Sequence, residues 1–285
     1  MPTFAGADDT RLHYDDVLPG EGDGGWWPVI ALAGGAARHP GYLGDLAGLG
    51  DRHRLIVPQL RGVGNSPMPA STETGSYWRQ AEDVERLRIH LGLERVALLG
   101  HSAGTRLALA YAAQFPGRVA RLALITPPAG YLVDEPSDAD ELTGRRRGEP
   151  VFEAALAALK AGPADTDDEE AFNAWHQQAA PASYAAWGAA EQDHAGTGRW
   201  SLAAAKAYFS VDPPCDFAAR LGGVTAPVLV VAGAEDCLTG LAPVLALAKL
   251  FPAGRAVVIE RCGHYPWVEQ PAAFREAVDA FLEGL

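Results

Sequence analysis

The sequence has few cysteines and no long apolar run, and each shortage excludes a class of protein. Three cysteines in 285 residues, without a C-x-x-C pair, do not make a disulfide framework. No apolar stretch is long enough to span a bilayer, and the N-terminus lacks the basic and apolar regions of a signal peptide. We therefore expect a cytoplasmic protein without membrane contacts, in which the cysteines are reduced thiols. They are Cys215, Cys237 and Cys262.

Positive charge is also scarce. Lysine and arginine together number 23 against 36 acidic residues, which leaves a net charge of −13. Nucleic acids are bound by clustered basic side chains, so the sequence predicts no nucleic-acid partner. No group of residues has the spacing of a zinc site, and we expect no metal or other cofactor. The expected partner is a small-molecule or short-peptide substrate. The preference for arginine over lysine is typical of a high-GC bacterial genome.

Short apolar runs alternate with longer helical patterns along most of the chain. This alternation predicts an α/β fold with a mostly parallel central sheet flanked by helices. A glycine-rich stretch at residues 20–25 predicts a turn or hairpin loop. The predicted strands are residues 29–33, 54–57, 96–99, 119–125, 227–232 and 256–259, and the predicted helices are 77–91, 105–115 and 271–282.

The pattern changes between residues 130 and 208. No strand is predicted there, and the stretch is rich in alanine, acidic residues and aromatic residues. We expect a helical cap subdomain at 130–208, inserted into a core formed by residues 1–129 and 209–285.

The stretch Gly100-His101-Ser102-Ala103-Gly104 matches G-x-S-x-G, follows a predicted strand and precedes a predicted helix. That placement is required of a nucleophile elbow, in which a serine hydroxyl projects from a strained turn. Small neighbours at Gly100 and Gly104 let strand and helix approach each other. The alternative is a glycine-bracketed loop with a structural serine, but the context favours Ser102 as a nucleophile.

A serine nucleophile needs a base, and the base needs an acid to orient it. Asp236 follows the predicted strand 227–232, and His264 follows the predicted strand 256–259. Both therefore lie at the carboxyl edge of the sheet, where Ser102 also lies. We expect a Ser102–His264–Asp236 triad, with activity that rises with pH as the base loses its proton.

An oxyanion hole needs two preorganised backbone amides. The residue after the nucleophile, Ala103, is the first candidate, and the loop after the first core strand supplies Gly35 as the second. A simple turn at Gly34-Gly35 is the alternative, although one pair of glycines can form the turn and donate the amide. His101 precedes the nucleophile, so we expect its ring to point the opposite way, into the core or toward the loop after the first core strand.

With these motifs, the chain resembles the α/β-hydrolase superfamily over nearly its whole length, and within it the proline iminopeptidase-like branch. The resemblance implies an inserted cap, and its spacing favours Asp236 over the neighbouring Glu235 as the acid. The similar motifs are 61–67 (R-G-x-G-x-S followed by Pro), 102–112 and 115–119 (the helix after the nucleophile and its end) and 263–267 (the terminal histidine motif).

The chain departs from the iminopeptidase pattern at three places. The H-G-G-P-G loop is Ala-Gly-Gly-Ala-Ala at 33–37, and the tryptophan expected after the nucleophile is Ala103. The W-E pair of the cap, whose carboxylate holds a substrate amino group, is Trp187-Gly188, and the nearest carboxylate downstream is Glu191. Because a buried ammonium group needs a paired charge, these departures argue against an aminopeptidase.

The sequence thus predicts a serine hydrolase that cleaves a small carboxylic ester or amide through an acyl-enzyme. A proline iminopeptidase-like aminopeptidase, a cofactor-free enzyme of non-hydrolytic chemistry and a ligand-binding protein with a relic triad are the alternatives. Aromatic residues of the cap are expected to line an apolar pocket above Ser102, although packing between cap helices explains any one of them equally well. The expected substrate contacts are Gly34, Tyr131, Trp187 and Tyr265.

Overall fold

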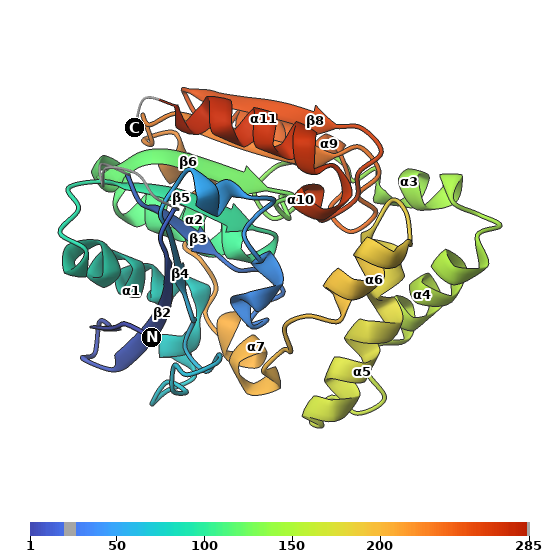
Figure 1. Cartoon of the computed structure of the whole chain (residues 1–285), viewed down its shortest axis with the longest axis horizontal. Coiled ribbons are helices and arrows are strands. Elements are labelled where there is room, and N and C mark those ends of the chain that lie inside the picture. The colour runs from blue at the N-terminus through green and yellow to red at the C-terminus, as the bar shows by residue number, and fades with distance from the viewer. Residues whose placement is uncertain (20–26, 284–285) are drawn as a thin grey trace.

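The computed structural model of the chain describes residues 1–19 and 27–283, so the predicted turn at 20–25 lies outside the described residues. Its centre is an eight-stranded sheet in the order β1-β2-β4-β3-β5-β6-β7-β8. Strands β1 and β2 run antiparallel to their neighbours, and the other pairs are parallel. The strands are β1 (Thr3–Ala5), β2 (Arg11–Val17), β3 (Val29–Leu32), β4 (Leu55–Pro58), β5 (Val96–His101), β6 (Val119–Ile125), β7 (Val228–Gly233) and β8 (Gly254–Ile259) (Figure 1).

The central strands are mostly apolar because both faces of the sheet are covered. Successive side chains of β3 alternate between two hydrophobic cores: Ile30 and Leu32 belong to one, Val29 and Ala31 to the other. Strands β5 and β7 are likewise buried along their whole length. This double burial explains why the sequence shows continuous apolar runs rather than alternating ones.

Helices cover the two faces from opposite sides. Residues of α1 and α2 pack into the first core, and residues of α11 pack into the second. The helices are α1 (Tyr77–His90), α2 (Ala103–Gln114), α3 (Ala139–Arg145), α4 (Pro150–Ala161), α5 (Glu169–Ala179), α6 (Ala189–Ala195), α7 (Leu202–Tyr208), α8 (Phe217–Leu221), α9 (Ala242–Ala248), α10 (Pro266–Glu269) and α11 (Pro271–Leu282).

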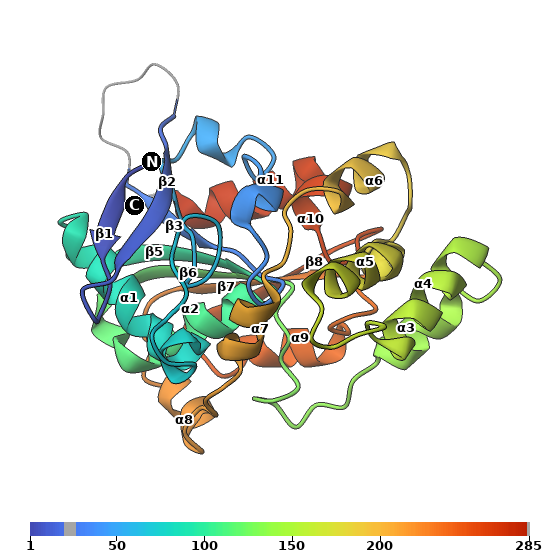
Figure 2. The same ribbon diagram turned by 90° about the horizontal axis from the view of Figure 1, so that it is seen from below.

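Residues 130–208, called the inserted segment below, contain helices α3 to α7 and no strand, and all of these residues are described. Helices α3, α4, α5 and α6 lie together at one side of the molecule, apart from α1 and α2 (Figures 1 and 2). The predicted fold class, a mostly parallel sheet flanked by helices with an inserted helical cap, is confirmed. The exact domain boundaries remain a prediction.

Each strand and helix predicted from the sequence has a counterpart within a few residues, and α11 has the predicted bounds. Strands β1 and β2 and helices α9 and α10 were not delimited by the sequence pattern. The three cysteines are free thiols, so Cys237 and Cys262 are not paired. Within the described part of the chain, no helix combines the length and apolar character needed to cross a membrane.

Candidate active site

Ser102 lies at the turn between β5 and α2, with φ 50° and ψ −123°. Such a backbone conformation costs on the order of 1–3 kcal/mol in a residue with a side chain. The flanking glycines are required by close packing: a Cβ on Gly100 would lie 2.9 Å from the Gly104 carbonyl oxygen, and a Cβ on Gly104 would overlap that of Leu32. The Ser102 amide donates to the Ile125 carbonyl at 2.9 Å. The G-x-S-x-G stretch therefore forms a strained strand–turn–helix unit.

Asp236 and His264 meet on loops that follow β7 and β8. The distance between His264 Nδ1 and Asp236 Oδ2 is 2.8 Å, and both side chains are buried. Asp236 also accepts hydrogen bonds from the Leu238 amide at 2.9 Å and the Thr239 hydroxyl at 2.5 Å. Burial alone would raise the pKa of Asp236, but the nearby His264 and these hydrogen bonds outweigh it and hold the pKa below its ordinary value. Asp236 is therefore an ionised acceptor next to His264.

The neighbouring carboxylate, Glu235, lies elsewhere: it lines a separate pocket with Arg145 and Arg146. Ser102 and His264 line one cavity. Among the hydrogen bonds of the described residues, none joins Ser102 to the His264 ring. Contacts between a nucleophile and its base often shorten to hydrogen-bond length only when substrate binds.

His101 connects the candidate base to the loop after β3. Its Nε2 lies 3.0 Å from the His264 carbonyl oxygen, and its Nδ1 lies 2.8 Å from the Tyr42 hydroxyl, which accepts a 2.6 Å hydrogen bond from the Gly34 amide. Burial lowers the pKa of His101 well below its ordinary value, so the ring is neutral. Because a carbonyl oxygen only accepts, the His101 proton is on Nε2, and the Tyr42 hydroxyl donates to Nδ1.

The two candidate oxyanion amides remain available. The Gly34 amide is used by Tyr42, whereas neither the Gly35 nor the Ala103 amide has an acceptor among the residues described. Gly35 has φ 68°, and a Cβ there would lie 2.7 Å from Trp200 Nε1. Both conditions require glycine at this position.

Arg38 follows this loop and is buried, with 3% of its surface exposed. Its Nη1 donates to the Tyr265 hydroxyl at 3.1 Å. No salt bridge to Arg38 occurs within the described ranges. Its other donors bind backbone carbonyls of the inserted segment, so the charge is stabilised by dipoles rather than by a carboxylate. These carbonyls are those of His194, Ala195, Thr197 and Gly198.

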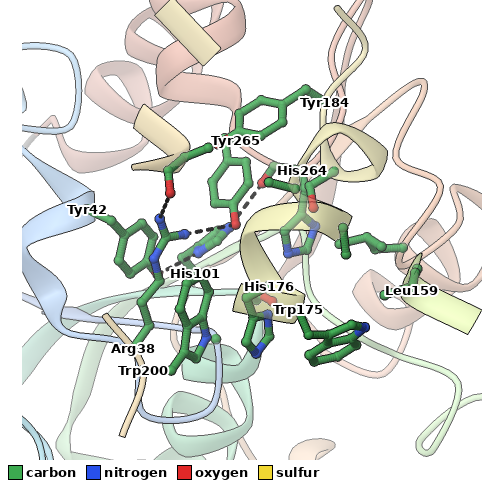
Figure 3. Close-up of a pocket in the computed structure, with 17 residues that line it drawn as sticks. Arg38, Tyr42, His101, Leu159, Trp175, His176, Tyr184, Trp200, His264 and Tyr265 are labelled. Carbon is green, nitrogen blue, oxygen red and sulfur yellow. Dashed lines mark hydrogen bonds between the residues drawn. The ribbon is translucent and has the colours of Figure 1, made fainter. Parts of the chain in front are cut away.

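The side chains of Arg38, Trp200 and His176 form a stack, which Figure 3 shows side by side. The Arg38 guanidinium lies 4.4 Å from the Trp200 ring centroid. The His176 ring stacks on Trp200, with 4.0 Å between the ring centroids and an angle of 3° between the ring planes. Burial, followed by the Arg38 charge, lowers the pKa of His176 to about 4, so it is neutral at pH 7. Trp200 Nε1 and His176 Nε2 are buried without a hydrogen-bond partner among the described residues. Two unpartnered polar atoms therefore lie beside the candidate nucleophile's cavity.

This cavity has a volume of about 140 Å³. A cavity of roughly 150 Å³ holds a benzene ring, so the space above Ser102 fits a compact group. Among the described residues that line it there is one cation, Arg38, and no carboxylate. The lining residues are Gly35, Arg38, Tyr42, His101, Ser102, Leu159, Trp175, His176, Ala179, Ala180, Ser183, Tyr184, Ala195, Trp200, Leu238, His264 and Tyr265 (Figure 3).

The four expected substrate contacts fall at different places. Tyr265 lines the cavity, and Gly34 lies directly behind Ser102, since a Cβ on Gly34 would be 2.9 Å from that of Ser102. Tyr131 is not among the lining residues; it lies beneath Arg106, 3.7 Å from the guanidinium. Trp187 is also absent from the lining. It packs beside Tyr184, with 5.4 Å between the two ring centroids. Of the four expected contacts, Tyr265 alone is among the residues that line the cavity.

Sequence reasoning did not identify Arg38, Tyr42 or His176 as residues of the site. No local motif marks Arg38, because its partners lie about 150 residues or more along the chain. The residues that shape the cavity walls are therefore found mainly through long-range packing.

A family model described as the alpha/beta hydrolase fold matches residues 18–271. The chain belongs to this family, as the resemblance predicted, and is an α/β-hydrolase enzyme. It is 28% identical over 286 residues to 2-hydroxy-6-oxononadienedioate/2-hydroxy-6-oxononatrienedioate hydrolase 2 of Pseudomonas putida, with 96% of this chain and 92% of the relative covered.

The chain is also similar to a curated protein and to a solved structure. The chain is 32% identical over 117 residues to a proline iminopeptidase of Xylella fastidiosa, which covers 41% of this chain and 36% of the relative. The crystal structure of an esterase from Rhodococcus sp. matches with a TM-score of 0.74 at 24% identity, covering 100% of this chain and 98% of that one. The second similarity shows the fold alone, and the first is confined to part of the chain.

Proposed function

We propose that this enzyme is a serine hydrolase that cleaves a small carboxylic ester or amide through an acyl-enzyme. The observation that carries the proposal is the 2.8 Å contact between His264 and Asp236 at the cavity lined by the strained Ser102. Nucleophile, base and orienting acid on three loops at one sheet edge are the parts that acyl transfer requires.

In the proposed mechanism, His264 removes the proton of Ser102 as the hydroxyl attacks the substrate carbonyl. Asp236 accepts a hydrogen bond from the Nδ1–H of His264, which fixes the tautomer and stabilises the charged ring. The Gly35 and Ala103 amides donate to the tetrahedral oxyanion. His264 then protonates the leaving group, and water releases the acyl group by the reverse steps.

Residues 130–208 serve in this proposal as the cap that closes the cavity. Leu159, Trp175 and Trp200 of this segment line the cavity together with Ser102. A cap that excludes water strengthens the electrostatic interactions of the oxyanion and limits the size of the substrate. The proposed core comprises residues 1–129 and 209–285.

The charge of the cavity favours an ester or a neutral amide over an aminoacyl substrate. A substrate ammonium group would be placed near the buried Arg38, and the described lining residues offer it no carboxylate. Unpaired burial of an ammonium group is unfavourable, and a like charge adds to the cost. The partial similarity to an iminopeptidase therefore does not extend, in this proposal, to its substrate.

The proposal is tested by comparing kcat/KM for short acyl esters, proline arylamide and other aminoacyl arylamides, with Ser102→Ala as the control. We expect ester turnover that Ser102→Ala abolishes, and little arylamide turnover. Strong serine-dependent proline release would overturn the substrate assignment. Activity that survives in Ser102→Ala would instead indicate non-hydrolytic chemistry, and ligand binding without turnover a binding protein.

A further inference from the structure

A second hollow adjoins the candidate active site. This apolar groove has a volume of about 450 Å³ and is open to solvent between α5 and α7. Its walls include Phe172 from α5 and Leu202 and Ala205 from α7, and Phe209 follows that helix. Lys206, at the rim, is paired with Asp167 at 2.6 Å. The groove is therefore an apolar surface with its charged neighbour already neutralised.

The groove adjoins the Ser102 cavity and shares part of its lining. Gly35, Trp175 and His176 line both spaces, and Gly35 is a candidate oxyanion donor. These three residues therefore mark the place where a chain attached to a carbonyl at Ser102 would leave the cavity and enter the groove. His176, whose Nε2 is buried without a hydrogen-bond partner among the described residues, belongs to this shared lining.

The two volumes determine where a larger substrate would extend. The Ser102 cavity, at about 140 Å³, holds little more than one ring, whereas small-molecule sites commonly measure roughly 300–1,000 Å³. The groove supplies about three times the space of the cavity, and its walls are apolar. A substrate with an ester group and a longer hydrocarbon arm would fill both spaces. Its polar group would lie at the junction and its arm would lie in the groove.

We infer that the groove between α5 and α7 is the subsite for an apolar alkyl or aryl arm of the substrate, so that this enzyme prefers esters with a medium-length hydrocarbon chain. The inference rests on the proposed ester hydrolysis at Ser102. Each methylene buried in the groove raises kcat/KM by up to about fourfold, which makes an eight-carbon chain a better substrate than a two-carbon chain.

The test fills the groove without touching the cavity. Ala205 lines the groove, whereas Ala203 lies on the exposed side of the same helix, so Ala205→Phe and Ala203→Phe form a matched pair. Two substrate series are used: p-nitrophenyl acetate against octanoate, and ethyl acetate against octyl acetate. The first extends the acyl side and the second the alcohol side.

We expect Ala205→Phe to lower kcat/KM for the eight-carbon member of one series about tenfold or more, with the two-carbon member within twofold of the wild type. Ala203→Phe should change kcat/KM for neither the two-carbon nor the eight-carbon member. The series that responds to Ala205→Phe shows whether the arm belongs to the acyl side or the alcohol side of the ester. If Ala205→Phe does not fold, Phe209→Ala removes part of the half-exposed groove wall and should reduce the same chain-length preference several-fold. An unchanged preference in both series overturns the inference.

A binding measurement separates this inference from the proposed function. Octyl acetate and methyl octanoate are titrated into Ser102→Ala, with and without Ala205→Phe. Binding that weakens about tenfold in the double variant supports the groove even if no ester is turned over. Serine-dependent ester turnover with binding indifferent to Ala205→Phe supports the proposed function and rejects the groove.

Discussion

The ring of His101 donates from Nε2 to the carbonyl oxygen of His264 at 3.0 Å, so the residue before the candidate nucleophile holds the backbone of the candidate base. Through Tyr42 the same ring is connected to the Gly34 amide. A single series of hydrogen bonds therefore joins the loop of the candidate oxyanion donor to the loop of the candidate base.

Tyr42→Phe removes the hydroxyl in the middle of this series and leaves two buried polar atoms, the Gly34 amide and His101 Nδ1, without a partner. We expect the free energy of unfolding in urea to fall by about 1–3 kcal/mol. Tyr14→Phe is a suitable control, because its hydroxyl makes a 3.3 Å contact with His90 at a partly exposed site. An equal loss in the two variants would contradict the role of the Tyr42 hydroxyl.

Asp236→Asn should remove the orienting acceptor of His264 while preserving the shape of the side chain. We expect kcat/KM for an ester to fall by roughly 10³–10⁴-fold, the usual scale for loss of this group. Glu235→Gln, at the adjacent residue, should change it less than threefold because Glu235 lies in another pocket. A larger loss of kcat/KM in Glu235→Gln than in Asp236→Asn would identify Glu235 as the acid.

Ser102→Gly and Ser102→Ala should both be inactive but should differ in stability. The φ of 50° is strained for alanine as for serine, whereas glycine adopts it readily. We expect the glycine variant to unfold at the higher urea concentration, with a free-energy difference of about 1 kcal/mol. An alanine variant as stable as the glycine variant would show that the turn carries little strain.

Glu269 predicts how stability depends on pH. Burial raises its pKa from 4.5 to about 7, although the Gly263, Ala185 and Tyr265 amides donate to its carboxylate and oppose the rise. The unfolded chain therefore releases this proton first, and stability falls as pH rises from about 4.5 to 7. Between pH 5 and 8, the free energy of unfolding should fall by about 2–3 kcal/mol more in the wild type than in Glu269→Gln. Parallel pH profiles in urea denaturation would refute this.

The elements that carry the site were predictable because their signals are local. A buried parallel strand is a continuous apolar run, and a nucleophile elbow places a small-residue motif between such a run and a helix. Val96–His101 and the following helix show both within twenty residues. The order of Ser102, Asp236 and His264 follows from which strand ends they occupy.

The walls of the cavity were less predictable because tertiary packing decides them. Tyr131 and Trp187 have the same composition signal as Trp200, yet only Trp200 faces the cavity. What distinguishes them is the side of the fold on which each is buried, and a single sequence does not encode that in a local pattern. Edge strand β8 also differs from the central strands, since most of its residues are partly or fully exposed.

The attachment of Arg38 to the inserted segment has a consequence for variation in this chain. Its guanidinium binds carbonyl oxygens of His194, Ala195, Thr197 and Gly198, and every amino acid supplies such an oxygen. The side chain of Thr197 can therefore be exchanged during evolution or in a combinatorial library while the anchoring of the segment persists. The sequence at this border can diverge without a compensating mutation at Arg38.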